Sequence, residues 1–262
     1  MIQFLAAVAL LACGPGRTTF ARYPGSSPTF DRASADPKAV EIADRVIAAA
    51  GGAEHWNAAK QLRWKQVITQ DGKQVIAGEQ AWDRWNGRHH ARAKRAEGDI
   101  VVMRPLYENG GMVFMDDGQR MRKIEGGAEE SIATARQRWE FDTALLFMPF
   151  LLEEPGTKLA YDGEVTGENG KPHDALLVTF DAKDLRRSKY RVIVDRETSQ
   201  IDRIEIEKPG AERLGYGLTE WSEGGGIKFP GKLQNLGYAG EVITFAELTA
   251  GDVDDTLFVP PL

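Results

Sequence analysis

The sequence contains little of the chemistry that small catalytic or metal sites need. Only one cysteine and four histidines occur among its 262 residues. A lone cysteine excludes a disulfide framework, and no HExxH, CxxC, GxSxG or zinc-type spacing is present. The segment Gly215-Tyr216-Gly217 lacks the third glycine of a dinucleotide fingerprint. We therefore expect no catalytic residues, no metal and no cofactor, and hence no enzyme.

The chain also has no excess of positive charge and no long hydrophobic segment. Its formal net charge of −6 argues against a general nucleic-acid binder. An apolar content of 42% and a charged content of 27% are ordinary for a soluble globular chain. The apolar run from Ile2 to Ala12, which only Gln3 interrupts, is about half as long as the ~20 residues of a membrane-spanning helix.

That N-terminal run leads directly into the only cysteine, Cys13. The residues Leu10-Leu11-Ala12-Cys13 resemble the lipobox of a bacterial lipoprotein signal peptide, in which the chain is cut before the cysteine and the thiol carries a diacylglyceryl group. The resemblance implies a signal peptide over residues 1–12, lipidation at Cys13 and attachment to a membrane through the acyl chains. Because Met1-Ile2-Gln3 carries no Lys or Arg, plain secretion and a cytoplasmic protein with an apolar tail stay open as alternatives.

A composition change separates this start from the rest of the chain. Residues 13–35 are rich in Gly, Pro, Ser and Thr and indicate a flexible tether. Asp36-Pro37 is typical of a helix start, with Asp as N-cap and Pro at the first helical position. We see no further boundary and expect one domain over residues 36–262.

The pattern within that domain is mostly that of short strands. A helix is expected from Pro37 to the Gly51-Gly52 pair, and from Gln61 onward the apolar residues alternate. Asp71-Gly72 and Asn86-Gly87 are hairpin signals. Residues 131–154 interrupt the strands with an apolar helix that Pro149 kinks or restarts. The sequence predicts a mainly β (α+β) fold, a curved antiparallel sheet of about 11–12 strands with an N-terminal helix and an inserted helix.

Several segments, in their order along the chain, are similar to those of a known family. They are the first helix with its Gly-Gly stop, Tyr190–Ile204 (YRVIVDRETSQIDRI), Gly226–Pro230 and Asp254–Pro260. Together they resemble the LolA/LolB-like periplasmic proteins, which include the outer-membrane lipoprotein-sorting group. The resemblance implies an incomplete antiparallel β-barrel whose helices plug the open side. It also implies an apolar cavity for an acyl chain, a lipid or an acylated protein.

A cavity for acyl chains needs apolar side chains on the concave face. Strand alternation and the inserted helix, which would act as the lid, supply the candidate ligand-binding residues Leu62, Trp64, Ile68, Trp82, Trp139, Leu146, Phe147 and Phe150. Trp82 and Trp85 lie on opposite faces of their strand, so at most one points inward. For each candidate, plain core packing is the competing interpretation.

The charged residues give no sharper hypothesis. Arg84, Arg88, His89, His90, Arg92, Lys94 and Arg95 form a basic stretch that would either meet anionic headgroups or be the solvated side of a sheet. His89 and His90 point to opposite faces, so they cannot bind one metal together. A hydrolase would require a buried His-carboxylate pair, around His173 or His55.

The preferred hypothesis is a lipid-anchored, non-enzymatic carrier or acceptor on the periplasmic face of the outer membrane. Gly14 favours the outer membrane weakly, since it is not a retention residue for the inner one. A soluble periplasmic or secreted protein is the alternative location. The alternative function is a protein-interaction or envelope-sensing module, whose groove or edge strands would bind a segment of a periplasmic partner. No nucleic-acid partner is expected.

Overall fold

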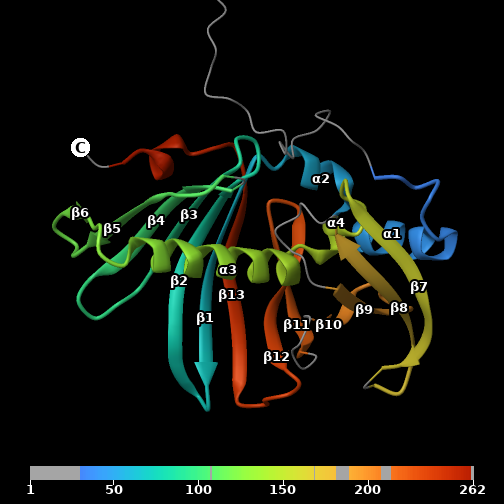
Figure 1. The fold of residues 1–262 in the computed structure, drawn as a ribbon. Coiled ribbons are helices and arrows are strands. Elements are labelled where there is room, and N and C mark those ends of the chain that lie inside the picture. Colours follow the sequence, from blue (N-terminus) through green and yellow to red (C-terminus); the bar gives the residue numbers. More distant parts are fainter. Residues whose placement is uncertain (1–29, 107, 168, 181–188, 208–213, 261–262) are drawn as a thin grey trace, which may run out of the picture.

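The computed structural model describes residues 30–106, 108–167, 169–180, 189–207 and 214–260. They form one antiparallel sheet of thirteen strands, slightly more than expected (Figure 1). The strands are β1 (Gln61–Gln70), β2 (Lys73–Asp83), β3 (Arg88–Ala93), β4 (Asp99–Pro105), β5 (Met112–Asp116), β6 (Met121–Lys123), β7 (Thr157–Thr166), β8 (Pro172–Phe180), β9 (Lys189–Asp195), β10 (Ile201–Glu207), β11 (Leu214–Gly224), β12 (Ile227–Asn235) and β13 (Glu241–Gly251). The helices are α1 (Pro37–Ala49), α2 (Gly52–Ala58), α3 (Ala128–Leu146), α4 (Met148–Leu151) and the 3-10 helix η1 (Asp255–Phe258). The expected mainly β fold is confirmed.

Two meanders make up the sheet. The strand order runs from β6 down to β1, then from β13 down to β7, so β1 and β13 join the two halves. The helices α3 and α4 connect β6 to β7, which are the two edge strands of the sheet. Laid flat, twelve strand spacings would separate these edges by roughly 58 Å, whereas α3 is about 28 Å long. The curvature of the sheet lets one helix cross its inner face (Figure 1).

The hydrophobic core lies between this inner face and the helices. Leu62, Trp64 and Ile68 alternate along β1 into the core, as the period-two pattern predicts. The same cluster contains Ile42 and Val46 of α1, together with the apolar residues of α4. A smaller cluster on the inner face joins the first half of α3 to β4 and β5.

Local sequence signals account for the main turns. Asp71 and Gly72 both have positive φ, 49° and 76°, as a type I′ hairpin turn requires. Helix α3 ends at Leu146 and α4 begins at Met148 with Pro149 in its first turn, so of the two predicted outcomes, a kink or a restart, the structure has the restart. Gly51 at the end of α1 contacts the β11–β12 turn, where an added Cβ would lie 1.9 Å from the carbonyl oxygen of Gly226.

The edge strand β7 is partly covered by the start of α1. The Asp36 carboxylate accepts hydrogen bonds from the backbone N–H groups of Lys38 and Tyr161, at 2.9 and 3.1 Å. The Asp36 N–H in turn donates to the carbonyl oxygen of Leu159 at 3.5 Å. Asp36 therefore caps the helix and occupies backbone groups of β7 that an added strand would use. Less of the β7 edge is therefore left for an added strand of a partner protein, which is one form of the alternative function.

The expected signal peptide (residues 1–12), the lipidation site Cys13 and most of the expected tether lie outside the described residues. The last part of that tether contacts the domain. Phe30 packs against the core, and Arg32 pairs with Asp44 at 2.6 Å and with Glu153 at 2.7 Å. Among the described residues, no helix is both long enough and apolar enough to span a bilayer.

Replacing Asp36 with Ala should lower the thermal unfolding midpoint at neutral pH, because both the helix cap and the contact to β7 are lost. The hydrogen bond from Tyr161, with those from Lys38 and Ala39, holds the pKa of Asp36 below its ordinary 3.8. A lowered folded-state pKa means that the stabilisation is present above the unfolded value and lost as pH falls through the folded one. The midpoint difference between wild type and Asp36→Ala, measured by circular dichroism, should therefore shrink below about pH 4. The exposed Glu41→Gln serves as the control, and an equal difference at all pH values would contradict the assignment.

Candidate ligand-binding site beneath helix α3

The structure brings the eight predicted ligand-binding residues together in one cluster. Each is at most 5% exposed, and all belong to the core between the inner face and α3–α4. Trp82 meets Trp139 edge-on at 5.3 Å between ring centroids, and Trp64 meets Phe147 edge-on at 5.6 Å. Their placement on one face is as expected, and their role in binding a ligand stays a prediction. At this burial, a ligand could reach them only if α3 and α4 moved away from the sheet.

The cluster includes an aromatic residue that the sequence did not single out. Trp56 of α2 stacks on Phe150 at 4.7 Å with nearly parallel rings. The guanidinium of Arg84 lies 3.7 Å from the centroid of Trp56 and donates to the carbonyl oxygens of Trp56 and Ala59. Arg84 is thus a buried residue that closes one end of the cluster, not a member of a solvated basic stripe. The seven-residue length of α2 gave too few turns to show an apolar face.

Helix α3 carries one carboxylate, Asp142, into this apolar region. Asp142 is fully buried and accepts hydrogen bonds from Gln66 Nε2 at 2.6 Å and from Trp64 Nε1 at 3.3 Å. Gln80 Nε2 donates to the same carboxylate, and Arg138, one turn earlier on α3, donates from Nε at 2.7 Å. A buried charge is tolerated only when it is paired and hydrogen-bonded. Here strands β1 and β2 supply the neutral donors and the helix supplies the cation.

The hydrogen-bond network continues along the inner face, and from Arg104 through His89 and Gln80 to Asp142 each residue donates to the next. Arg104 Nε donates to His89 Nδ1 at 3.1 Å, because arginine has no acceptor. The proton of a neutral His89 therefore sits on Nε2, which donates to Gln80 Oε1 at 2.9 Å. That bond fixes the Gln80 amide with its NH₂ group toward Asp142. Sequence reasoning missed this arrangement, since inward-pointing polar residues on β2, β3 and β4 read as a solvated face.

Burial sets the protonation states of this network. Desolvation lowers the pKa of His89 well below 6.5, and the nearby charges of Arg104 and His90 act in the same direction. His89 is therefore neutral, as the hydrogen bonds require. Complete burial raises the pKa of Asp142 above 3.8, while Arg138, Gln66 and Trp64 act against that rise. All of its partners are donors, so the geometry holds Asp142 as a carboxylate.

The indole N–H groups of Trp82 and Trp139 lie next to this network and have no hydrogen-bond acceptor among the described residues. These two residues are 0% and 1% exposed. A buried donor without a partner costs about 1–3 kcal/mol. A bound molecule with an oxygen acceptor near its apolar part would remove that cost.

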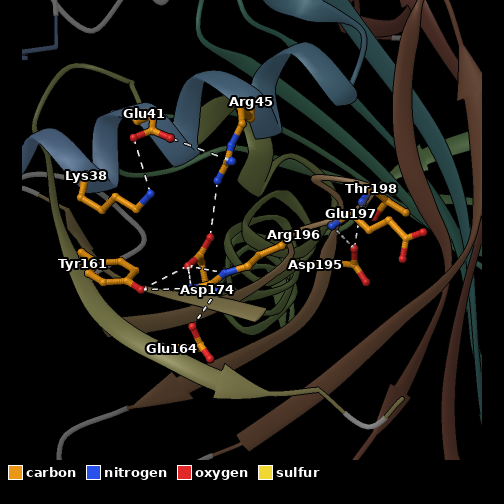
Figure 2. A network of polar contacts seen from close by, with 10 residues as sticks. All are labelled: Lys38, Glu41, Arg45, Tyr161, Glu164, Asp174, Asp195, Arg196, Glu197 and Thr198. Atoms are coloured by element: carbon orange, nitrogen blue, oxygen red, sulfur yellow. Dashed lines mark hydrogen bonds and ion pairs between the residues drawn. The ribbon is translucent and has the colours of Figure 1, made fainter. Parts of the chain in front are cut away.

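A second polar cluster fixes α1 to the other wing of the sheet (Figure 2). Asp174 of β8, 2% exposed, accepts from Arg196 at 2.6 and 2.9 Å, from the Tyr161 hydroxyl at 3.2 Å and from Arg45 of α1 at 3.4 Å. Burial acts to raise the pKa of Asp174, but hydrogen bonding and the charge of Arg196 lower it overall. Arg196 also pairs with Glu164 at 2.6 Å. This cluster holds α1 in place, independently of α3.

Other charged residues that the sequence analysis singled out form ion pairs within the fold. Arg88 pairs with Asp83 at 2.6 Å and with Asp255 at 2.5 Å, and Arg92 pairs with Asp99 and Asp116 at 3.1 and 2.7 Å. The basic stretch is therefore divided among ion pairs and the two faces of the sheet.

His173 does lie near carboxylates, 3.6 Å from Asp195 and 3.7 Å from Asp202. Its ring is fully buried and is covered by Gly167, where an added Cβ would lie 2.3 Å away. This pair therefore offers no room for a substrate. Within the described residues, no group of three or more His, Cys, Asp and Glu side chains is arranged to hold a metal.

The residues described so far define an open antiparallel sheet whose inner face is covered by a helical insertion. No protein-family model matches the sequence, and no curated protein matches it. Among solved structures, a LolA superfamily protein from Nitrosomonas europaea matches with a TM-score of 0.49 at 11% identity, over 83% of this chain and 97% of that chain. A Vibrio parahaemolyticus domain described as an outer membrane lipoprotein-sorting protein matches with a TM-score of 0.46 at 10% identity, over 85% and 96%.

The Pseudomonas aeruginosa MucA/MucB complex also contains a matching chain, with a TM-score of 0.25 at 19% identity. That match covers 85% of this chain and 61% of the other. The first two structures are of the kind that the sequence resembles. At these identities and TM-scores the likeness carries no conclusion about a ligand or a partner.

Replacing Asp142 with Asn should destabilise the protein by about 3 kcal/mol, because Arg138 loses its buried carboxylate partner. The NH₂ group of the asparagine would also face N–H donors that now bond to the carboxylate. Urea unfolding of the two proteins measures this difference, with an unchanged slope as the sign of an unchanged fold. Glu140→Gln, on the same helix and in an i,i+4 pair with Arg136, should lose less than about 0.5 kcal/mol. Equal stability of Asp142→Asn and wild type would show that the carboxylate is not held as an anion.

Proposed function

We propose that the protein is a non-enzymatic carrier or acceptor that holds an acyl chain, as a lipid or an acylated protein, between α3 and the inner face of the sheet. The observation that carries this proposal is the aromatic and aliphatic cluster beneath a helix that is tied to the sheet through one carboxylate. An acyl chain offers no hydrogen bonds, so apolar surface is what its binding requires. The cluster supplies that surface from Trp64, Trp82, Trp139, Phe147 and Phe150.

The polar network makes α3 suited to two positions. In the closed position every partner of Asp142 is in place, so the position is well defined. Opening would expose the carboxylate and Arg138 to water, where both charges are solvated, so part of the lost energy is regained. The apolar contacts of the same helix have no such compensation when they are exposed to water. The helix is thereby a candidate for an element with two arrangements whose balance a ligand shifts.

The unpartnered indole N–H groups indicate where a ligand's polar end would lie. The indole N–H groups of Trp82 and Trp139 are buried, and the guanidinium of Arg104 lies 5.9 Å from the centroid of the Trp139 ring. An ester or carboxylate oxygen at that point would accept from the indoles, next to a positive charge. The acyl tail would then extend along the aromatic residues toward α4.

We also propose that a lipid anchor at Cys13 locates this activity in the cell envelope. Lipidation at Cys13 would hold the domain on the periplasmic face of the outer membrane. If Gly14 to Ala35 form the flexible tether that the sequence predicts, these 22 residues would have a root-mean-square reach of about 25 Å. Because Phe30 and Arg32 contact the domain, the effective tether would be shorter and would hold the domain close to the membrane surface. An acceptor of acylated molecules would use that proximity to pass them on.

Purified protein should bind a fluorescent fatty acid, and native mass spectrometry after incubation with phospholipid should show one bound lipid. Asp142→Asn should bind the fatty acid more tightly than wild type, because a loosened lid costs less to open. For each 1.4 kcal/mol by which the substitution lowers the free-energy cost of opening α3, the apparent affinity should rise about tenfold, up to the affinity of the open form itself.

Glu140→Gln, which leaves the network intact, should bind as wild type does. No binding by any of the three proteins would contradict a carrier function. Binding that is equal in all three would contradict the role of α3 as the lid while leaving the ligand class in place.

Cys13→Ala should abolish metabolic labelling with fatty acid and should move the protein from the membrane fraction to the soluble fraction. The physical reason is that the acyl chains on the cysteine are the proposed attachment, each buried methylene contributing about 0.8 kcal/mol. Labelling and fractionation of cells that express the wild type and the variant measure both effects. Continued membrane association of an unlabelled variant would contradict the anchor.

A further inference from the structure

The residues just before α1 connect that helix to the C-terminal end of the helical insert formed by α3 and α4. We call residues 30–36 the strap; they lead directly into α1 (Figure 1). Phe30 packs against the core. Arg32 forms ion pairs with Asp44 of α1 and with Glu153, which follows the end of α4. The strap thus joins α1 to the point where the insert returns to the sheet.

The guanidinium of Arg32 is shared between two carboxylates. Its Nη1 and Nη2 donate to the two oxygens of Asp44 at 3.1 and 2.6 Å. Nη1 also lies 2.7 Å from each oxygen of Glu153. The Glu153 side chain is only 16% exposed. Most exposed ion pairs contribute little to stability, but a bidentate arginine within a network of charges is the arrangement in which they do.

The two carboxylates would repel each other without the arginine. Burial raises the pKa of Glu153 above its ordinary 4.5, the charge of Arg32 acts against that rise, and the charge of Asp44 adds to it. Asp44 is therefore close enough to disfavour a negative charge on Glu153. Removal of the Arg32 charge would replace an attraction between α1 and the end of the insert by a repulsion.

The two elements that Arg32 joins are held in different ways. Helix α1 is held by its buried residues and by Arg45, which pairs with Asp174 of β8 at 3.4 Å. The polar attachment of the insert to the sheet runs through Asp142, which lies on α3. Helix α4 carries Phe150 of the aromatic cluster. The strap therefore attaches the insert at a second point, beside α4.

We propose that the strap controls the opening of the ligand site: Arg32 holds the α4 end of the insert against α1, and release of Arg32 makes α4 easier to open. The effect on a ligand rests on the proposed function, whereas the hold on α4 is a property of the free protein. The strap is the last part of the segment that would lead to the proposed anchor at Cys13. A pull on an anchored tether would therefore reach Phe30 and Arg32 before it reached α1.

The test is hydrogen exchange of the full chain without ligand, followed by mass spectrometry. The amides of Leu151 and Leu152 donate to the carbonyl oxygens of Phe147 and Met148 at 3.1 and 3.2 Å, so their exchange reports the opening of α4. Arg32→Gln should make these amides exchange about three to ten times faster, the scale expected for an ion-pair network of this kind. The amides of β1 and β13 should exchange as in the wild type, because the opening is local.

Arg136→Gln is the matched control, since it removes an arginine whose pair with Glu140 stays within α3. It should leave the exchange of Leu151 and Leu152 unchanged. Glu153→Gln should also speed that exchange, and Arg32→Gln with Glu153→Gln should speed it by less than the product of the two single effects. Such coupling is expected only if the two side chains act on α4 through each other.

Equal exchange of α4 in the wild type and Arg32→Gln would overturn the inference, and so would fully independent effects of the two substitutions. In the fluorescent fatty-acid assay, Arg32→Gln should bind more tightly by about the factor by which α4 opens more often. Unchanged affinity despite faster exchange would overturn the control of the ligand site. If neither protein binds the fatty acid, the proposed function fails, and the exchange data alone decide whether the strap holds α4.

Discussion

The buried carboxylate of Asp142 governs how the helical insertion sits on the sheet. A charge in that position is tolerable only with its full set of donors, which are Trp64, Gln66, Gln80 and Arg138. Because these donors belong to β1, β2 and α3, one group sets the position of the helix relative to two strands. The apolar cluster around it supplies most of the burial energy, which has no direction. The hydrogen bonds of the carboxylate are directional and therefore fix the position of the helix. The hydrogen bonds from Arg104 to His89 and from His89 to Gln80 fix the orientation of one donor, the Gln80 amide.

Much of the fold followed from sequence patterns that act locally. The alternation along Gln61–Gln70, the Asp71-Gly72 turn and the restart at Pro149 depend on neighbouring residues only, and each was predictable. The inward position of Leu62 and Trp82 followed from the same alternation. The pairing of β1 with β13 did not, because no local signal records which distant strand completes a sheet.

The polar parts of the molecule were the least predictable. The sequence did not single out Asp142 or Arg104, and His89 fell within a basic stretch, since charged side chains are rarely buried unless paired. Their partners in this network, except Arg138, lie 9 to 78 positions away. The arrangement of these polar residues arises from cross-strand neighbours, which a single sequence does not reveal. The apolar residues of the cluster were found except Trp56, whereas the residues whose identity matters through a specific partner were not found.

The joining of the two meanders by β1 and β13 has a consequence for how the chain folds. These strands are the first and the last of the sheet, and their paired residues stand between 171 (Gln70 to Glu241) and 190 (Gln61 to Gly251) positions apart. Non-local pairing of this kind slows folding, and until the C-terminal strand has been synthesised, β1 and β12 each present an open edge to other chains. A chain shortened by this one strand would have its gap at the centre of the sheet, where the loss separates the two halves.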